Sequence, residues 1–180
     1  MNWSQYSNEN HSVALGIGEA DLSKFVLLLK ETRATASKVW VLGNGGSATT
    51  AAHAVGDFGK TVKGFGGAPI FAIAPSEMTA LQTAYANDID FKDGFSETLG
   101  DCASQGDLVW IISVSGRSPN LLKAVEVSKS KGLKVVATVG ERGASLASEV
   151  DLCIVIPSDD YQIVENIQLG IMHWLTKQLD

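Results

Sequence analysis

Short apolar runs of strand length recur along this 180-residue chain, and this recurrence constrains the fold more than any other feature. Most of the runs are continuous, as in strands of a parallel sheet that is buried on both faces. Segments with helical periodicity separate them, and strands that alternate with helices predict a doubly wound α/β sheet. The predicted strands are Lys38–Leu42, Pro69–Ala74, Leu108–Ser113, Lys134–Val139 and Leu152–Ile156.

Helical periodicity is clearest at Ala20–Lys30, Ala48–Phe58, Pro119–Lys131 and Asp160–Leu179. Because 45% of the residues are hydrophobic, the chain can bury one sizeable core, and we expect a single domain over residues 1–180. Residues 1–36 precede the first strand, and we expect them to form an N-terminal helical extension. The last helix is apolar around most of its circumference, which favours packing against another subunit.

The acidic balance of the chain argues against several classes of partner. With 14 Lys and Arg residues against 20 Asp and Glu residues, the formal net charge is −6, and the basic residues are scattered. Binding to nucleic acid or to an anionic membrane surface needs a basic face, so we expect neither. Three features predict a cytoplasmic protein. The two cysteines lack CxxC spacing, no apolar run reaches the roughly 18 residues of a membrane span, and the N-terminus does not resemble a signal peptide.

A glycine-rich turn follows the first predicted strand. It reads Gly43-Asn44-Gly45-Gly46-Ser47-Ala48 and leads into a helix, whose first N–H groups can bind an anion. The string fits the dinucleotide pattern GxGxxA, but the second strand ends without the acidic residue that binds a ribose. A P-loop is excluded because no Lys-Ser or Lys-Thr follows the glycines, so we expect no nucleotide cofactor. A simpler interpretation is that Ser47 only caps the helix.

A serine-rich turn follows the third predicted strand. In Ser113-Val114-Ser115-Gly116-Arg117-Ser118-Pro119, the proline suits the first helical position and makes Ser118 the N-cap. Three hydroxyls and free helix N–H groups then converge, which is one way to hold a phosphate without much basic charge. Both turns follow the carboxyl ends of strands, where open α/β sheets bind ligands. This coincidence favours a phosphate site over a plain capped turn.

Together the two turns resemble the phosphosugar-binding pattern of sugar isomerase (SIS) domains, most closely that of the sedoheptulose 7-phosphate isomerases. The resemblance extends from about Val39 to Leu175. It implies a five-stranded SIS fold in which the serines hold the phosphate and residues after the first and second strands line the sugar. The substrate-binding residues that it implies are Asn44, Gly45, Ser47, Asn87, Asp88, Ser113, Val114, Ser115, Ser118 and Glu165.

Two of the three histidines fall on further positions of this resemblance. His53 and Asp57 lie four apart on one predicted helix and share a face that can bind a metal ion, although such a pair is more often solvated. The family carries His-x-x-x-Glu on this helix, and a Gln and a His eight residues apart near the C-terminus. The resemblance therefore implies a site for zinc or another divalent metal formed by His53, Asp57, Glu165 and His173. It further implies that Asp57 is the catalytic base and His173 its acid partner.

Three positions depart from the family pattern. Asp57 replaces a Glu, Glu165 replaces a Gln, and Val114 replaces a Thr. Since Glu165 and His173 are eight residues apart, about 12 Å along one helix, a shared ion needs inward-reaching side chains or helices from two subunits. The second arrangement agrees with the apolar last helix. We therefore expect a homo-oligomer, a tetramer by the resemblance, with active sites at subunit interfaces.

These features predict an isomerase that interconverts a ketose phosphate and an aldose phosphate. Moving a proton between adjacent carbons through an enediol needs a base at carbon, an acid at oxygen and a group that polarises the carbonyl. The resemblance implies that this pair is sedoheptulose 7-phosphate and D-glycero-D-manno-heptose 7-phosphate. Two alternatives stay open: an isomerase of another phosphosugar, and a non-catalytic SIS protein that serves as a replication-initiator partner or a sugar-phosphate sensor.

Overall fold

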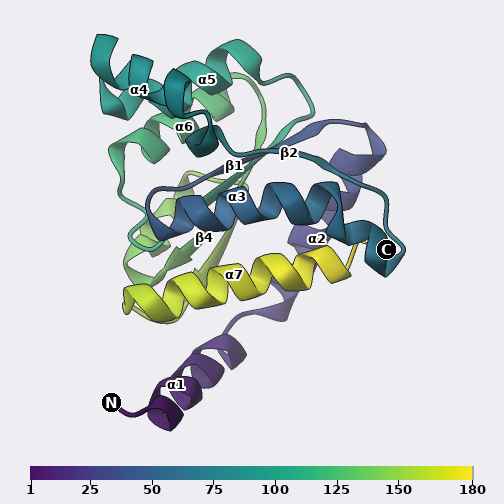
Figure 1. The fold of residues 1–180 in the computed structure, drawn as a ribbon, viewed down its shortest axis with the longest axis vertical. Helices are drawn as coiled ribbons and strands as arrows, with labels where there is room; N and C mark the ends of the chain where they lie inside the picture. Colours follow the sequence, from purple (N-terminus) through teal and green to yellow (C-terminus); the bar gives the residue numbers. More distant parts are fainter. Residues whose placement is uncertain (180) are drawn as a thin grey trace.

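The computed structural model describes residues 1–179 and confirms the α/β class. Five parallel strands form one sheet in the order β2-β1-β3-β4-β5, with helices on both faces (Figure 1). The doubly wound arrangement is therefore confirmed. The strands are β1 (Lys38–Leu42), β2 (Phe71–Ile73), β3 (Leu108–Ser113), β4 (Lys134–Gly140) and β5 (Leu152–Ile156).

The strand boundaries agree with the predicted runs except at β4, which extends one residue further to Gly140, and at β2, which is shorter than the predicted Pro69–Ala74. This strand lies at the edge of the sheet and pairs with β1 alone. The N–H of Ile70 donates to the carbonyl of Phe58, at the end of a helix, and is therefore not used in the sheet. Pro69 has no N–H to donate. The ladder consequently starts at Phe71.

Helices α2 (Glu19–Ala34), α3 (Gly46–Gly59) and α7 (Tyr161–Lys177) pack in one core, and α5 (Gly94–Cys102) and α6 (Pro119–Ser130) pack in the other. Successive strand residues alternate between the two cores, because side chains of a strand point to opposite faces. In β1, for example, Val41 lies in the first core and Leu42 in the second. Because each strand is buried on both faces of the sheet, its sequence is a continuous apolar run.

Most of the apolar surface of α7 is buried inside the chain itself, so a second subunit is not needed to explain it. Leu169 is partly buried against the same core, and Trp174 is 37% exposed. The fully packed residues of this helix are Ile163, Val164, Ile167, Ile171, Met172 and Leu175.

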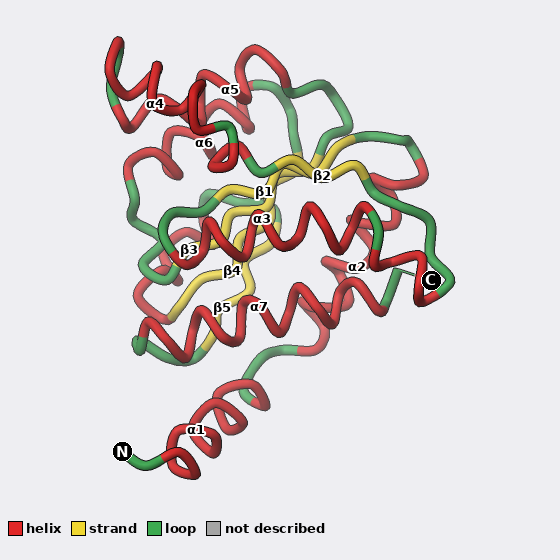
Figure 2. Tube along the Cα trace, viewed as in Figure 1, coloured by secondary structure: helices red, strands yellow, loops and turns green. Residues whose placement is uncertain are grey.

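Helices α1 (Trp3–Leu15) and α4 (Thr79–Asp88) contain no buried residue. They lie at opposite ends of the molecule, and a loop joins α1 to α2 (Figure 2). Short 3-10 segments at Thr61–Phe65, Pro75–Glu77, Phe91–Asp93 and Glu141–Ser148 complete the connections. Within residues 1–179, every helix is too short or too polar to cross a membrane.

Candidate active site

The first part of the site lies at the carboxyl edge of the sheet, where the strand order reverses. The chain leaves β1 toward β2 on one side, whereas it leaves β3 toward β4 and β5 on the other. The turns after β1 and β3 therefore diverge and leave a crevice. A cleft of about 100 Å³ lies there, lined by Asn44, Ser47, Ile112, Ser113, Val114, Ser115, Ser118, Leu121, Tyr161 and Glu165.

The glycine-rich turn after β1 forms one wall of this cleft. Gly45 has a φ of +55°, a conformation that other residues rarely adopt, and it occupies the N-cap of α3. Ser47 is already the second residue of the helix, so its interpretation as the N-cap is wrong. Its hydroxyl instead donates to Oε1 of Gln168 at 3.3 Å.

The serine-rich turn after β3 forms the opposite wall. Ser118 is the N-cap of α6, as predicted, but its side chain makes no capping hydrogen bond. Oγ of Ser113 accepts the N–H of Gly116 at 3.0 Å, and Oγ of Ser115 accepts the N–H of Arg117 at 3.3 Å. Each bond uses an acceptor lone pair and leaves the hydroxyl proton free. The turn is therefore braced by its own backbone while its hydroxyls can still donate to an anion.

An amide pair joins the two walls. Nδ2 of Asn44 donates to Oδ1 of Asn120 at 3.0 Å, and Nδ2 of Asn120 donates to Oδ1 of Asn44 at 2.9 Å. Asn120 is only 2% exposed and lies in the first turn of α6. The two bonds link the turn after β1 to the helix after β3 and so hold the width of the crevice.

The side chain of Gln168 in α7 stabilises the same region through hydrogen bonds. It is fully buried, and its Nε2 donates to the carbonyls of Ser113 at 3.2 Å and Thr138 at 3.0 Å. With the bond from Ser47, this one amide connects α3, β3, β4 and α7. Sequence reasoning missed both Gln168 and Asn120. The signal in the sequence was, for each of them, an amide side chain next to apolar residues of a predicted helix.

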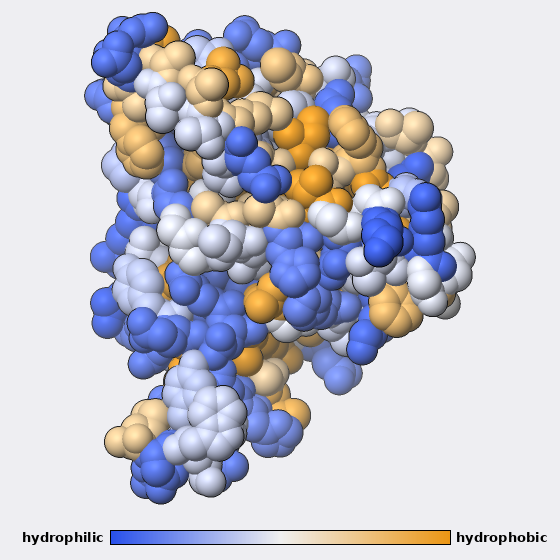
Figure 3. Space-filling model, in the orientation of Figure 1, coloured by the Kyte–Doolittle hydropathy of each residue, from blue (hydrophilic) through white to orange (hydrophobic). Residues whose placement is uncertain are grey.

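The second part of the site lies where α3 and α7 run side by side (Figure 1). Nε2 of His53 and Nε2 of His173 are 3.4 Å apart, and each is 3.8 Å from Oδ2 of Asp57. The two imidazole side chains are 47% and 45% exposed, whereas that of Asp57 is 13% exposed. Hydrophilic side chains gather over the middle of this face of the molecule (Figure 3).

This second group has the donor set of a metal site. One ligand atom from each of His53, Asp57 and His173 lies within 4.8 Å of the others. Two nitrogens bound tetrahedrally at about 2.1 Å from zinc would be about 3.4 Å apart, as the two imidazole nitrogens are. Two imidazoles and a carboxylate also suit zinc chemically, and three protein ligands leave a fourth position open, as catalytic zinc sites do.

Glu165, the fourth ligand expected from the sequence, does not belong to this group of three. It lines the cleft beside Gly46, where a Cβ added to the glycine would lie 2.3 Å from its Oε2. At a helical rise of 1.5 Å per residue, Glu165 and His173 are separated by about 12 Å along α7. Within one chain, the structure therefore brings together three of the four predicted ligands.

Comparison with known proteins identifies the family of this chain. A family model described as the SIS domain matches residues 5–140. A phosphoheptose isomerase from Thermodesulfovibrio yellowstonii is 33% identical over 177 residues, which cover 98% of this chain and 83% of that protein. The chain belongs to the SIS family.

Two further proteins named phosphoheptose isomerase are similar to this SIS chain. A phosphoheptose isomerase from Trichlorobacter lovleyi is 35% identical over 157 residues, covering 87% of this chain and 79% of that protein. The solved structure of a phosphoheptose isomerase from Neisseria gonorrhoeae has a TM-score of 0.90 at 23% identity, covering 98% and 96% of the two chains. This structural match supports the SIS fold predicted from the two turns.

Asn87 and Asp88 lie apart from the cleft of this SIS chain. They are the last residues of α4, are exposed, and form a hydrogen bond of 2.7 Å from Nδ2 of Asn87 to Oδ1 of Asp88. Neither residue is among those that line the cleft. Within one chain, the structure therefore does not bring these two predicted sugar-binding residues to the cleft.

Proposed function

We propose that this SIS protein is an aldose-ketose isomerase that interconverts sedoheptulose 7-phosphate and D-glycero-D-manno-heptose 7-phosphate. The observation that carries the proposal is the alignment of two sites along α3 and α7. The serine-lined cleft lies at the first turn of α3, and His53, Asp57 and His173 lie about two to three turns further along the same helices. The relatives named phosphoheptose isomerase support the reaction.

In this proposal Ser113, Ser115 and Ser118 bind the phosphate. No Lys or Arg lines the cleft among the described residues. The anion would instead be held by the three hydroxyls and by the N–H of Asn120 in the first turn of α6, because Pro119 has no N–H and the N–H of Leu121 donates to the carbonyl of Ser118. Asn44, Gly45 and Ser47 would position the adjoining sugar chain.

His53, Asp57 and His173 would hold the metal ion, which supplies polarisation of the substrate carbonyl when bound. We assign Asp57 to removal of the proton from the sugar carbon. His173 would return a proton to the oxygen through the ring nitrogen that does not bind the ion. The 3.8 Å between His173 Nε2 and Asp57 Oδ2 keeps the two groups on the same side of a small substrate.

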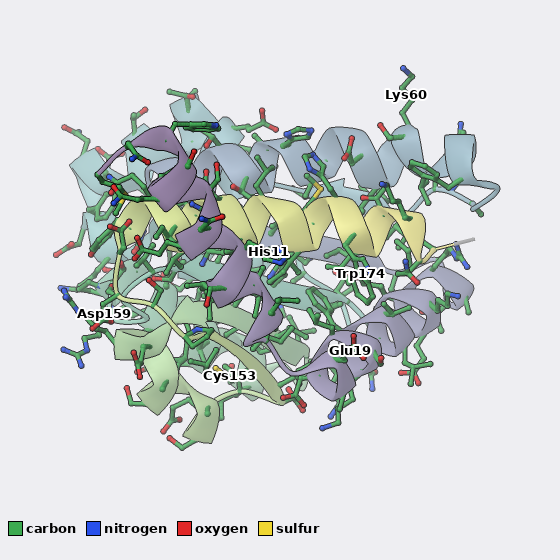
Figure 4. The ribbon with its side chains drawn as sticks, turned by 90° about the horizontal axis from the view of Figure 1, so that it is seen from below. His11, Glu19, Lys60, Cys153, Asp159 and Trp174 are labelled. Atoms are coloured by element: carbon green, nitrogen blue, oxygen red, sulfur yellow. The ribbon has the colours of Figure 1, made fainter. Side chains whose placement is uncertain are left out.

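We further propose that copies of the chain associate, as a tetramer by the family resemblance. A groove of about 520 Å³ separates α1 and α2 from α7, and it is lined by residues that include Ile17, Leu22 and Trp174. Figure 4 shows Trp174 between α7 and α2, with Glu19 of α2 nearby. Trp3 and Leu15 of α1 are 77% and 74% exposed, so each copy offers both a groove and exposed apolar side chains that can fill another.

The deciding experiment incubates the purified chain, without a histidine tag, with sedoheptulose 7-phosphate in the presence and absence of zinc. We expect formation of the aldose phosphate, with loss of activity on chelation and recovery on addition of zinc. Full activity in protein shown by elemental analysis to contain no metal would refute the metal site. Phosphosugar binding without turnover would instead favour the non-catalytic alternative.

A further inference from the structure

The carboxylate of Glu165 lies inside the cleft that we assign to phosphate. It lines the same space of about 100 Å³ as Ser113, Ser115 and Ser118. It also packs against Gly46, where a Cβ would come within 2.3 to 2.5 Å of three carboxyl atoms. In so small a cleft, a phosphate bound to the serines would lie next to this negative charge.

Among residues 1–179, no Lys, Arg or His forms an ion pair with Glu165 that would offset that charge. The ion pairs and hydrogen bonds found among residues 1–179 include none from its carboxylate. The nearest favourable influence is the first turn of α3, because the start of a helix stabilises negative charge. An ionised carboxylate can only accept hydrogen bonds, so the ligand that suits it must bring donors.

We propose that Glu165 is a specificity-determining residue that makes the cleft select phosphate esters of polyols over free inorganic phosphate. Inorganic phosphate places its charge beside the carboxylate and offers few donors in return. A sugar phosphate carries hydroxyls on the carbons next to its phosphate, and these can donate to Glu165 and offset the repulsion. The inference rests on the proposed phosphosugar function of the cleft.

The test measures dissociation constants by calorimetry for inorganic phosphate and for sedoheptulose 7-phosphate. In Glu165→Gln the charge is removed while one acceptor oxygen is retained. We expect this variant to bind inorganic phosphate several-fold more tightly and the sugar phosphate no more tightly than before. The preference of the wild type for the sugar phosphate should therefore fall about tenfold. Glu165→Ala should lower it further, because the remaining acceptor is lost.

The matched control is Glu126→Gln, which removes one negative charge from the exposed face of α6 and should leave the preference unchanged. An unchanged preference in Glu165→Gln would overturn the inference, as would equal weakening of both ligands, which indicates a purely structural role. Failure of the wild type to bind either ligand would overturn the phosphosugar function itself. A wild type that binds sugar phosphate, combined with an unaltered preference in the variant, refutes the role of Glu165 alone.

Discussion

The two ends of the contact between α3 and α7 differ in what holds their side chains in position. At the cleft, positions are set by backbone turns, by the Asn44–Asn120 amide pair and by the fully buried Gln168. At the other end, His53 and His173 are nearly half exposed and contact chiefly each other and Asp57. One end is preorganised by the fold, whereas the other consists of side chains that a bound ion would hold together.

This difference predicts how activity and stability respond to a substitution at each end. A substitution at the histidine end removes chemistry but little packing, since exposed side chains contribute little to stability. A substitution at the cleft end disturbs buried hydrogen bonds, and therefore changes stability and ligand binding together. Activity and stability should consequently respond independently at one end and jointly at the other.

The largest effect should come from His173→Asn. We expect kcat for the isomerisation to fall by about 10² to 10⁴-fold, because a positioned proton-transfer group contributes on this scale. The thermal midpoint should change little, since the imidazole is exposed. His11→Asn on the exposed α1 is the matched control and should retain full activity. A variant with wild-type kcat would exclude His173 from proton transfer.

Asn120→Ala probes the cleft end and should produce a smaller, joint effect. Removing one buried amide leaves that of Asn44 without two hydrogen bonds, at a cost of about 1–3 kcal/mol in the free energy of unfolding. Asn44 then no longer has a fixed orientation, so we expect KM to rise more than kcat falls. Urea unfolding and steady-state kinetics measure the two effects. Lower stability with an unaltered KM would show that the pair holds the fold without positioning the ligand.

The same contrast explains what could be predicted from the sequence. The strands, the helix after Ser118 and the spacing of His53 and Asp57 are local patterns, and the structure confirms those elements and brings His53 and Asp57 together with His173. The Asn44–Asn120 pair joins residues 76 positions apart, and Gln168 contacts Ser47 from 121 positions away. Such contacts depend on how α6 and α7 pack on the sheet, which periodicity does not specify. Glu165 shows the same limit, since spacing alone does not say which neighbour a helix face meets.

Asp107 extends the comparison to a carboxylate whose hydrogen-bond donors are all supplied by the protein. It is 2% exposed and accepts the N–H groups of Lys38 at 2.8 Å and Ser104 at 3.0 Å, together with the indole N–H of Trp40 at 2.8 Å. Burial, the largest influence, raises its pKa, but hydrogen bonds from Ser104, Trp40 and Lys38 outweigh burial and hold the pKa below the usual 3.8.

Because the folded-state pKa of Asp107 is depressed, its stabilising contribution is present above pH 3.8 and is lost as pH falls through the folded-state pKa. Asp107→Asn should therefore lower the free energy of unfolding by about 1–3 kcal/mol at neutral pH, and the difference from wild type should shrink below pH 3.8. Urea titrations at several pH values measure this. Asp101→Asn at the exposed end of α5 is the control. A difference that stays constant with pH would show that geometry, not charge, accounts for the loss.

The smallest effect should come from Ser115→Ala. Its hydroxyl is one of three proposed phosphate donors, and its single intramolecular bond, from the N–H of Arg117, is long at 3.3 Å. Losing one donor among three should weaken sugar phosphate binding several-fold, in line with about 1 kcal/mol for one hydrogen bond. Stability should be nearly unchanged, which separates this serine from Asn120 in the same cleft. Calorimetric titration decides the matter: an unaltered dissociation constant would remove Ser115 from the phosphate site and leave Ser113 and Ser118 to hold the anion.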